Sequence, residues 1–240
     1  MAVEDSAAAA VVSVVAVRQG VGDMAFLSET EKKTLSAKIN HAESRTRAEI
    51  VTVIAQTSDG YRYIPTLWAA LIALSVPGLH YLWLALNADG WATTEIAENA
   101  PHWLYSIQVL TFLGLGMIFQ IPKTRLWMVP KSVKRQRAAR HAREQFFLQN
   151  LHETRGRTGI LIFVSVAEQY VEIIVDTAIA AVVDNQVWHK TVEEFIQHVR
   201  KGDISTGFES SIEDCRQIVW EHFPAPEGRP DELPNHLIEV

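Results

Sequence analysis

Two long apolar runs dominate the pattern of hydrophobic and polar positions along this chain of 240 residues. They cover 64–86 and 103–121, and neither contains Asp, Glu, Lys or Arg. A helix rises ~1.5 Å per residue, so runs of this length suit a hydrocarbon core ~30 Å thick. The pattern predicts a transmembrane hairpin over 63–122. The alternative, two buried helices of a soluble core, is disfavoured because helices this long and apolar rarely fit so small a domain.

The distribution of charge predicts which way the hairpin faces. Eight basic and no acidic residues lie between Lys123 and Arg143, whereas the spacer 87–102 has acidic residues and neither Lys nor Arg. Basic residues next to a membrane span favour the cytoplasmic side. We therefore expect a multi-pass protein of the cell (inner) membrane with both termini in the cytoplasm. The net charge of -6 averages these unlike regions and says little about partners.

The segment before the hairpin predicts one helix and one strand. Ser28 and Glu31 have the spacing of a capping box, and Leu35, Ile39 and Ala42 then repeat at helical spacing. The following segment, 49–57, is rich in β-branched residues and apolar at nearly every position. A strand covered on both faces has this composition.

The segment after the hairpin begins with a predicted helix over 131–151 that has a basic side. We expect that side to lie against anionic lipid headgroups, at which each cation contributes about 1 kcal/mol. The residues concerned are Lys131, Lys134, Arg137, Arg140 and Arg143. A plain solvated face that only sets the topology is the other interpretation, and both stay open. Nucleic-acid binding is disfavoured because no stacking aromatic residues alternate with these cations.

Two strands and two helices are predicted next. The strands are 158–167 and 170–175, and the two residues between them allow an antiparallel hairpin but no parallel crossover. Apolar residues at helical spacing then mark helices near 188–199 and 208–219. We expect 28–62 and 123–223 to form one cytoplasmic α/β domain that the hairpin interrupts. The ends are predicted to be a disordered or mis-assigned extension over 1–27 and an extended, mobile Pro-rich tail over 224–240.

The segments 45–51, 154–162 and 171–176, taken in this order, resemble the TPM domain. The arrangement is similar to the membrane-embedded branch of that family, in which a transmembrane pair interrupts the domain. The resemblance implies an α/β/α sandwich around a small mixed sheet. It also implies three associations: acid phosphatase activity, binding of Ca²⁺ or a related divalent ion such as Mg²⁺, and assembly or maintenance of membrane protein complexes.

The resemblance implies a metal site made by Glu49, Asp176 and Asp184 at the ends of strands. Hard divalent cations take several oxygen ligands, which carboxylates supply. The chain departs from the commoner family pattern at 176–181, where many members have a Gly-rich segment. The alternatives are that Glu49 pairs with Arg45 or Arg47 and that Asp176 closes a turn.

The sequence has no pattern of a catalytic centre. It lacks the HExxH, GxSxG and Walker motifs, and its one cysteine, Cys215, lies on an apolar helical face typical of a buried thiol. We therefore favour a non-enzymatic membrane protein whose domain binds other membrane proteins, or a second copy of itself, and helps to assemble or maintain complexes. The alternative is a divalent-metal-dependent phosphatase at the membrane surface.

Overall fold

The structure is a computed structural model that describes residues 26–87, 92–225, 233 and 235–240. Most of the predicted N-terminal extension therefore lies outside the described residues. The centre of the molecule is a four-stranded sheet in the order β3-β2-β1-β4. Strands β1 (Glu49–Ala55) and β2 (Gly159–Ser165) are parallel, although the whole hairpin separates them in sequence. Strand β3 (Tyr170–Val175) is antiparallel to β2, as the two-residue gap predicts.

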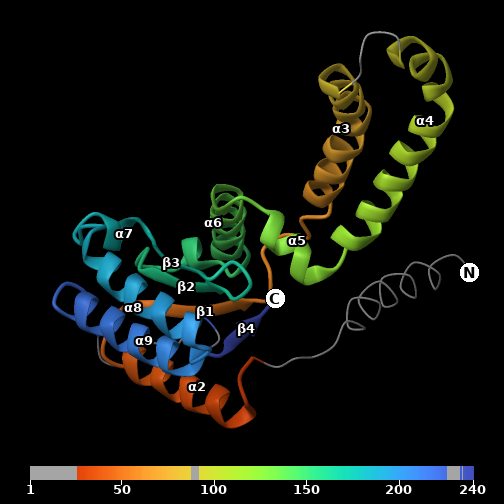
Figure 1. Ribbon diagram of the computed structural model, residues 1–240. Helices are drawn as coiled ribbons and strands as arrows, with labels where there is room; N and C mark the ends of the chain where they lie inside the picture. The colour runs from red at the N-terminus through yellow and green to blue at the C-terminus, as the bar shows by residue number, and fades with distance from the viewer. Residues whose placement is uncertain (1–25, 88–91, 226–232, 234) are drawn as a thin grey trace, which may run out of the picture.

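Helices cover both faces of this sheet. Helices α2 (Glu29–Glu43), α8 (Val187–Lys201) and α9 (Ile204–Trp220) pack on one face, and α6 (Lys131–Leu148) packs on the other (Figure 1). Alternate residues of β1 enter two separate cores: Ile50 and Ile54 face the three helices, whereas Val51 and Val53 face α6. Burial on both faces explains the continuous apolar composition of the strand. The predicted α/β/α sandwich with a mixed sheet is confirmed.

Local signals place the helix ends. Both hydrogen bonds of the capping box at Ser28 and Glu31 are present, and Leu35, Ile39 and Ala42 are buried as predicted. Helix α6 stops at Leu148, and a separate 3-10 turn, η1 (Leu151–Glu153), replaces the last predicted turn. A short helix, α7 (Thr177–Ala180), follows β3.

The end of the chain is part of the sheet. Strand β4 (Leu237–Glu239) pairs in parallel with β1, and the Val240 N–H donates to the Ile54 carbonyl at 2.9 Å. The expectation of a mobile tail is wrong for these last residues. The prolines of the preceding segment predict an irregular tail, and a strand of three residues is too short to show the alternation of apolar and polar positions that would predict it.

Helices α3 (Tyr63–Asn87) and α4 (Ala92–Phe119) form a hairpin that projects from the sandwich, and α5 (Pro122–Met128) leads back to it (Figure 1). By length and composition, one described helix, Tyr63–Leu86, suffices to cross a membrane, whereas the apolar part of α4, Trp103–Phe119, is shorter. Only 17% of the most apolar window of α3 is buried. These helices are therefore not the core of the sandwich. The spacer between the two helices is shorter than the predicted 87–102, because α4 begins at Ala92.

Candidate functional site

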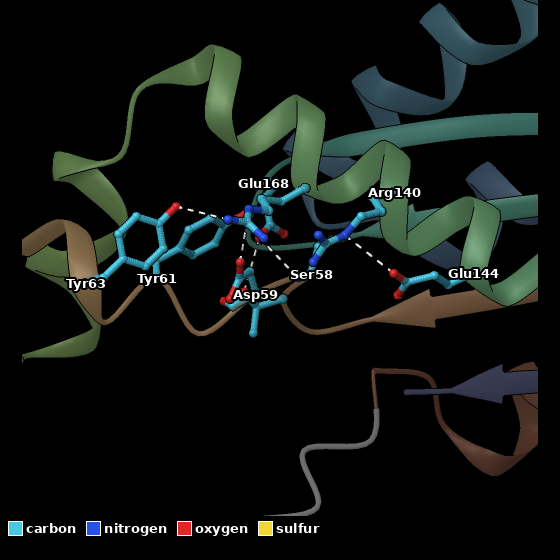
Figure 2. A network of polar contacts seen from close by, with 9 residues as sticks. Ser58, Asp59, Tyr61, Tyr63, Arg140, Glu144 and Glu168 are labelled. Atoms are coloured by element: carbon cyan, nitrogen blue, oxygen red, sulfur yellow. Dashed lines mark hydrogen bonds and ion pairs between the residues drawn. The ribbon is translucent and has the colours of Figure 1, made fainter.

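The carboxyl end of strands β1 and β2 carries a network of polar contacts centred on Glu168. This residue lies in the turn between β2 and β3, opposite the segment that leaves β1 (Figure 2). Its Oε1 accepts hydrogen bonds from Thr57 Oγ1 at 3.1 Å, Ser58 N at 3.0 Å and Tyr61 Oη at 2.8 Å. Its Oε2 accepts from the hydroxyl of Ser165, which in turn accepts from Ser58 Oγ at 2.9 Å. One carboxylate therefore joins the end of β2 to the chain that enters the hairpin.

The Glu168 carboxylate has donors around it, and no ion pair with it occurs within the described residues. Hydrogen bonds to a charged group contribute about 1.5–3 kcal/mol each, more than bonds between neutral groups. A half-buried carboxylate with four donors is thus a strong and specific connection. It holds Ser58 and Tyr61 in fixed positions relative to the sheet.

Tyr61 is the second part of this connection. It is only 2% exposed and adopts a left-handed backbone conformation, with φ of 47°, that is uncommon for residues other than glycine. Burial, together with the bond to Glu168, raises the pKa of its hydroxyl, so the group remains a neutral donor. Ile64 of α3 and Val129 pack with it in a small apolar cluster. The packing offsets the cost of the backbone conformation.

Arg137 of α6 completes the connection from the opposite side. Its Nε lies 3.2 Å from Asp59 Oδ2, and its Nη2 donates to Tyr63 Oη at 3.3 Å. The guanidinium carbon also lies 5.9 Å from the centroid of the Tyr63 ring, within the range of a cation–π contact. We call the segment 57–64, with Glu168 and Arg137, the junction. It fastens the first turn of α3 to both β2 and α6.

Two of the three predicted metal ligands lie at the other end of the sheet. Glu49 begins β1 and is 1% exposed, and Asp176 follows β3 and is 5% exposed. Because β3 is antiparallel, the two reach the same end of the sheet, with Gly159 of β2 between them. Asp184 is exposed on the segment after α7. The structure brings two of the three predicted ligands to one end and leaves the third on the surface.

The geometry of these carboxylates fits a metal ion poorly. Asp176 Oδ1 accepts from the Thr177 N–H at 2.6 Å, and its Oδ2 lies 4.0 Å from Arg157 Nη1. Asp184 Oδ1 accepts from the Gln186 N–H at 2.8 Å. In the part of the chain that the structure describes, no three His, Cys, Asp or Glu residues form a group that could hold a metal ion. Binding of Ca²⁺ or Mg²⁺ stays a prediction.

The five predicted lipid-facing cations have different surroundings. Arg137 belongs to the junction, and Arg140 lies 3.4 Å from Glu144 on the same helix (Figure 2). Lys131, Lys134 and Arg143 make no ion pair with any described residue. Contact of the set with headgroups stays a prediction, although two of its members already have carboxylate partners.

Sequence reasoning missed Glu168, Tyr61 and Asp59. Glu168 stood only as one of two residues between the predicted strands, and its partner Tyr61 is 107 positions away. One sequence signal could have found them. The turn that contains Glu168 and the turn that contains Asp59 and Tyr61 each follow the carboxyl end of a predicted strand, and these two strands could be neighbours in the sheet. The expected role of Cys215 was correct, because the residue is fully buried and burial raises the pKa of its thiol.

Comparison with known proteins agrees with this architecture. Residues 123–218 match the model of the TPM domain, which confirms the resemblance to that domain over this part of the chain. The structure is similar to the NMR structure of the BA42 protein from the psychrophilic bacterium Bizionia argentinensis, with a TM-score of 0.55 and 17% identity. That similarity covers 91% of this chain and 99% of BA42, and at this identity it shows the fold alone. None of the curated proteins matches the sequence. The family match begins at Lys123, yet β1, before the hairpin, belongs to the same sheet.

Proposed function

We propose that this chain is an integral membrane protein whose cytoplasmic TPM domain binds other membrane proteins and helps to assemble or maintain their complexes. The observation that carries the proposal is the junction. It connects the apolar hairpin to the sheet through Glu168, Tyr61 and Arg137, and not through a free linker. A domain held in this way stays at a constant distance and angle from the bilayer, where it meets the cytoplasmic parts of other membrane proteins.

Exposed apolar side chains support the membrane location of the hairpin. On α3, Leu74 is 66% and Trp83 61% exposed, and on α4, Leu110 is 68% and Met117 78% exposed. A continuous apolar surface of this extent is stable in lipid or against a partner. In this proposal both helices span the bilayer. The acidic spacer and the basic segment 123–143 favour a cytoplasmic position for the sandwich and for both termini.

The binding role is favoured over phosphatase activity on chemical grounds. A metal-dependent phosphatase needs several oxygen ligands around its ion, and the described residues gather no such group. Among the residues that the structure describes, no specific contact favours the phosphatase.

Cysteine labelling tests the topology. Cys215 is buried, so an introduced cysteine at Trp91 or Ser58 is the reactive thiol. The proposal expects that a membrane-impermeant maleimide labels the Trp91→Cys variant from outside intact cells and labels the Ser58→Cys variant only after permeabilisation. External labelling of Ser58→Cys would overturn the orientation.

Affinity capture from native membranes after mild cross-linking tests the binding role. The proposal expects specific membrane proteins to be recovered with the wild type, and recovery to fall when Glu168→Ala loosens the junction. Glu144→Ala, which removes an exposed carboxylate of α6, is the matched control. Repeated recovery of the chain alone would contradict the proposal. Hydrolysis of a phosphomonoester that Asp176→Ala abolishes would instead support the phosphatase.

A further inference from the structure

The outer side of strand β3 is an unpaired sheet edge. Strand β3 ends the sheet, with β2 as its neighbour on one side. The Asp176 N–H donates to the Gly159 carbonyl at 2.9 Å, which fixes the alternation of hydrogen-bonded pairs along the two antiparallel strands. By that alternation, the backbone groups of Val171, Ile173 and Val175 point away from β2. No described strand pairs with them.

This edge forms the floor of a groove between α6 and α8. A hollow of about 870 Å³ lies along Tyr170 and Val171, and a second of about 330 Å³ continues along 172–175. Together they follow the full length of β3. An extended segment of about six residues would fit this length, since a strand rises ~3.3 Å per residue.

The two walls of the groove differ in chemistry. Helix α6 contributes Lys131, Lys134, Arg135 and Arg143, whereas α8 contributes the apolar side chains of Val192 and Ile196 and, at its end, Arg200. None of these five cations makes an ion pair within the described residues. The wall along α6 therefore has a surplus of positive charge.

The carboxylates that line the groove offset only part of this surplus. Two carboxylates face five cations: Glu168 accepts from four donors, and Glu172 Oε2 accepts from Tyr170 Oη at 2.9 Å. Trp188, also in the lining, has a buried indole N–H with no acceptor among the described residues. This nitrogen has almost no accessible surface, so it belongs to the packed core beneath the groove.

We propose that this groove binds an extended acidic segment of a partner protein, which adds to the sheet as a further strand beside β3. The proposal deepens the binding function above and rests on it. Alternate side chains of an added strand point to opposite faces, so acidic residues would face α6 and apolar residues would face α8. Glu172 lies half-way along the floor and would repel an acidic residue beside it. The acidic residues of the added strand therefore lie near Lys131 and Arg135, and its residues beside 172–175 are neutral.

Charge and backbone hydrogen bonding disfavour two other occupants. A second copy of the chain, paired edge to edge, would bring two basic walls together. A lipid headgroup would contact the cations but would leave the backbone groups of Val171, Ile173 and Val175 without partners. A strand with acidic residues on one side satisfies both the cations and the backbone.

The test measures fluorescence anisotropy of a labelled peptide, Glu-Val-Glu-Ile-Thr-Val-Thr, and of its reversed sequence, with the full chain in detergent or nanodiscs. We expect one of the two to bind. Methylation of the peptide amide nitrogens that face β3 should weaken binding at least ~tenfold, because a strand ladder needs these donors. The Lys131→Glu/Arg135→Glu variant should weaken it by a similar factor, whereas Lys190→Glu, on the exposed side of α8, should not.

A protein variant tests the same strand ladder from the other side. Ile173→Pro removes an N–H that points away from β2, a position at which an edge strand tolerates proline. It should abolish peptide binding while the variant still unfolds cooperatively. If the variant does not fold, the methylated peptide makes the same test on the wild type.

Each of the other results overturns the inference. Absence of binding by either peptide at millimolar concentration, or equal binding of the methylated peptide, excludes strand addition. Binding to phosphatidylglycerol vesicles that needs Lys131 and Arg135, while the peptide fails to compete, identifies a lipid surface instead. A dimer that Ile173→Pro dissociates identifies a second copy as the occupant. If capture from membranes recovers partners equally well with Lys131→Glu/Arg135→Glu, the groove assignment fails and the binding function stands.

Discussion

The two ends of the central sheet differ in what their carboxylates do. At the amino end of β1 and β2, Asp176 caps a four-residue helix, and Asp184, on the surface after that helix, closes a turn. At the carboxyl end, Glu168 accepts three hydrogen bonds from residues that lead into the hairpin and a fourth from Ser165 of β2. The resemblance to a family directs attention to the first end, whereas the polar connections between the hairpin and the sandwich lie at the second. Carboxylates at strand ends can thus serve architecture as well as metal binding.

This difference between the two ends predicts that loss of Glu168 has the largest effect on the free energy of unfolding. Glu168→Ala leaves the Tyr61 and Ser165 hydroxyls and the Ser58 N–H without their acceptor and should lower the free energy of unfolding by ~3 kcal/mol. Denaturant unfolding in mild detergent measures the change. Glu144→Ala, which removes an exposed ion pair, should cost less than ~0.5 kcal/mol. Equal effects of the two variants would remove the distinction between the ends of the sheet.

Removal of Arg137 should have a smaller effect at the same end. Arg137→Ala loses the ion pair to Asp59 and the contacts with Tyr63, and partly exposed pairs contribute ~1 kcal/mol or less. Proteolysis gives a second measurement, since cleavage within 57–62 should become faster. Arg140→Ala, one turn further along α6, is the matched control and should leave cleavage unchanged.

Metal addition tests the predicted metal site at the amino end of β1 and β2. A site with a Kd of ~10 µM would raise the free energy of unfolding by ~2.7 kcal/mol at ~1 mM metal. The resemblance predicts such a rise with Ca²⁺ or Mg²⁺, whereas the hydrogen-bonded geometry of Asp176 and Asp184 predicts none with these ions or with Mn²⁺. The geometry also predicts that Asp176→Ala changes stability by no more than ~1 kcal/mol, because the loss of a cap is partly offset by removal of a buried oxygen without a hydrogen-bond partner. A metal-specific rise that this variant abolishes would show that the predicted site exists.

The smallest expected effect is a dependence on pH at the groove beside β3. Burial raises the pKa of Glu172, although the bond from Tyr170 and the nearby Arg143 oppose the rise. An acid whose pKa is higher in the folded state than in the unfolded state destabilises the fold as pH rises through that interval. Glu172→Gln should therefore be more stable than the wild type at neutral pH, and this advantage should vanish as pH falls below about 4.5. A constant difference across the titration would mean that the charge of Glu172 has no role.

Much of the fold follows from local sequence signals, and the junction does not. The capping box at Ser28, the continuous apolar strand from Glu49 and the short gap after β2 predict their elements correctly. These signals predict correctly because each depends only on residues that are close together in the sequence. Strand β4 is too short to show a period, and Glu168 meets Tyr61 only once β1 and β2 are adjacent. The predicted metal ligands came from family resemblance, and the structure leaves Asp184 on the surface.

A distance measurement by electron spin resonance tests the central claim, that the junction holds the hairpin and the sandwich as one rigid unit. Spin labels at His189→Cys on α8 and Leu110→Cys on α4 report the distance between the two parts, and buried Cys215 need not be removed. In nanodiscs, the wild-type background should show one narrow distribution that Glu168→Ala broadens and Glu144→Ala leaves unchanged. A broad distribution in the wild type, or a narrow one in a folded Glu168→Ala variant, would contradict the account.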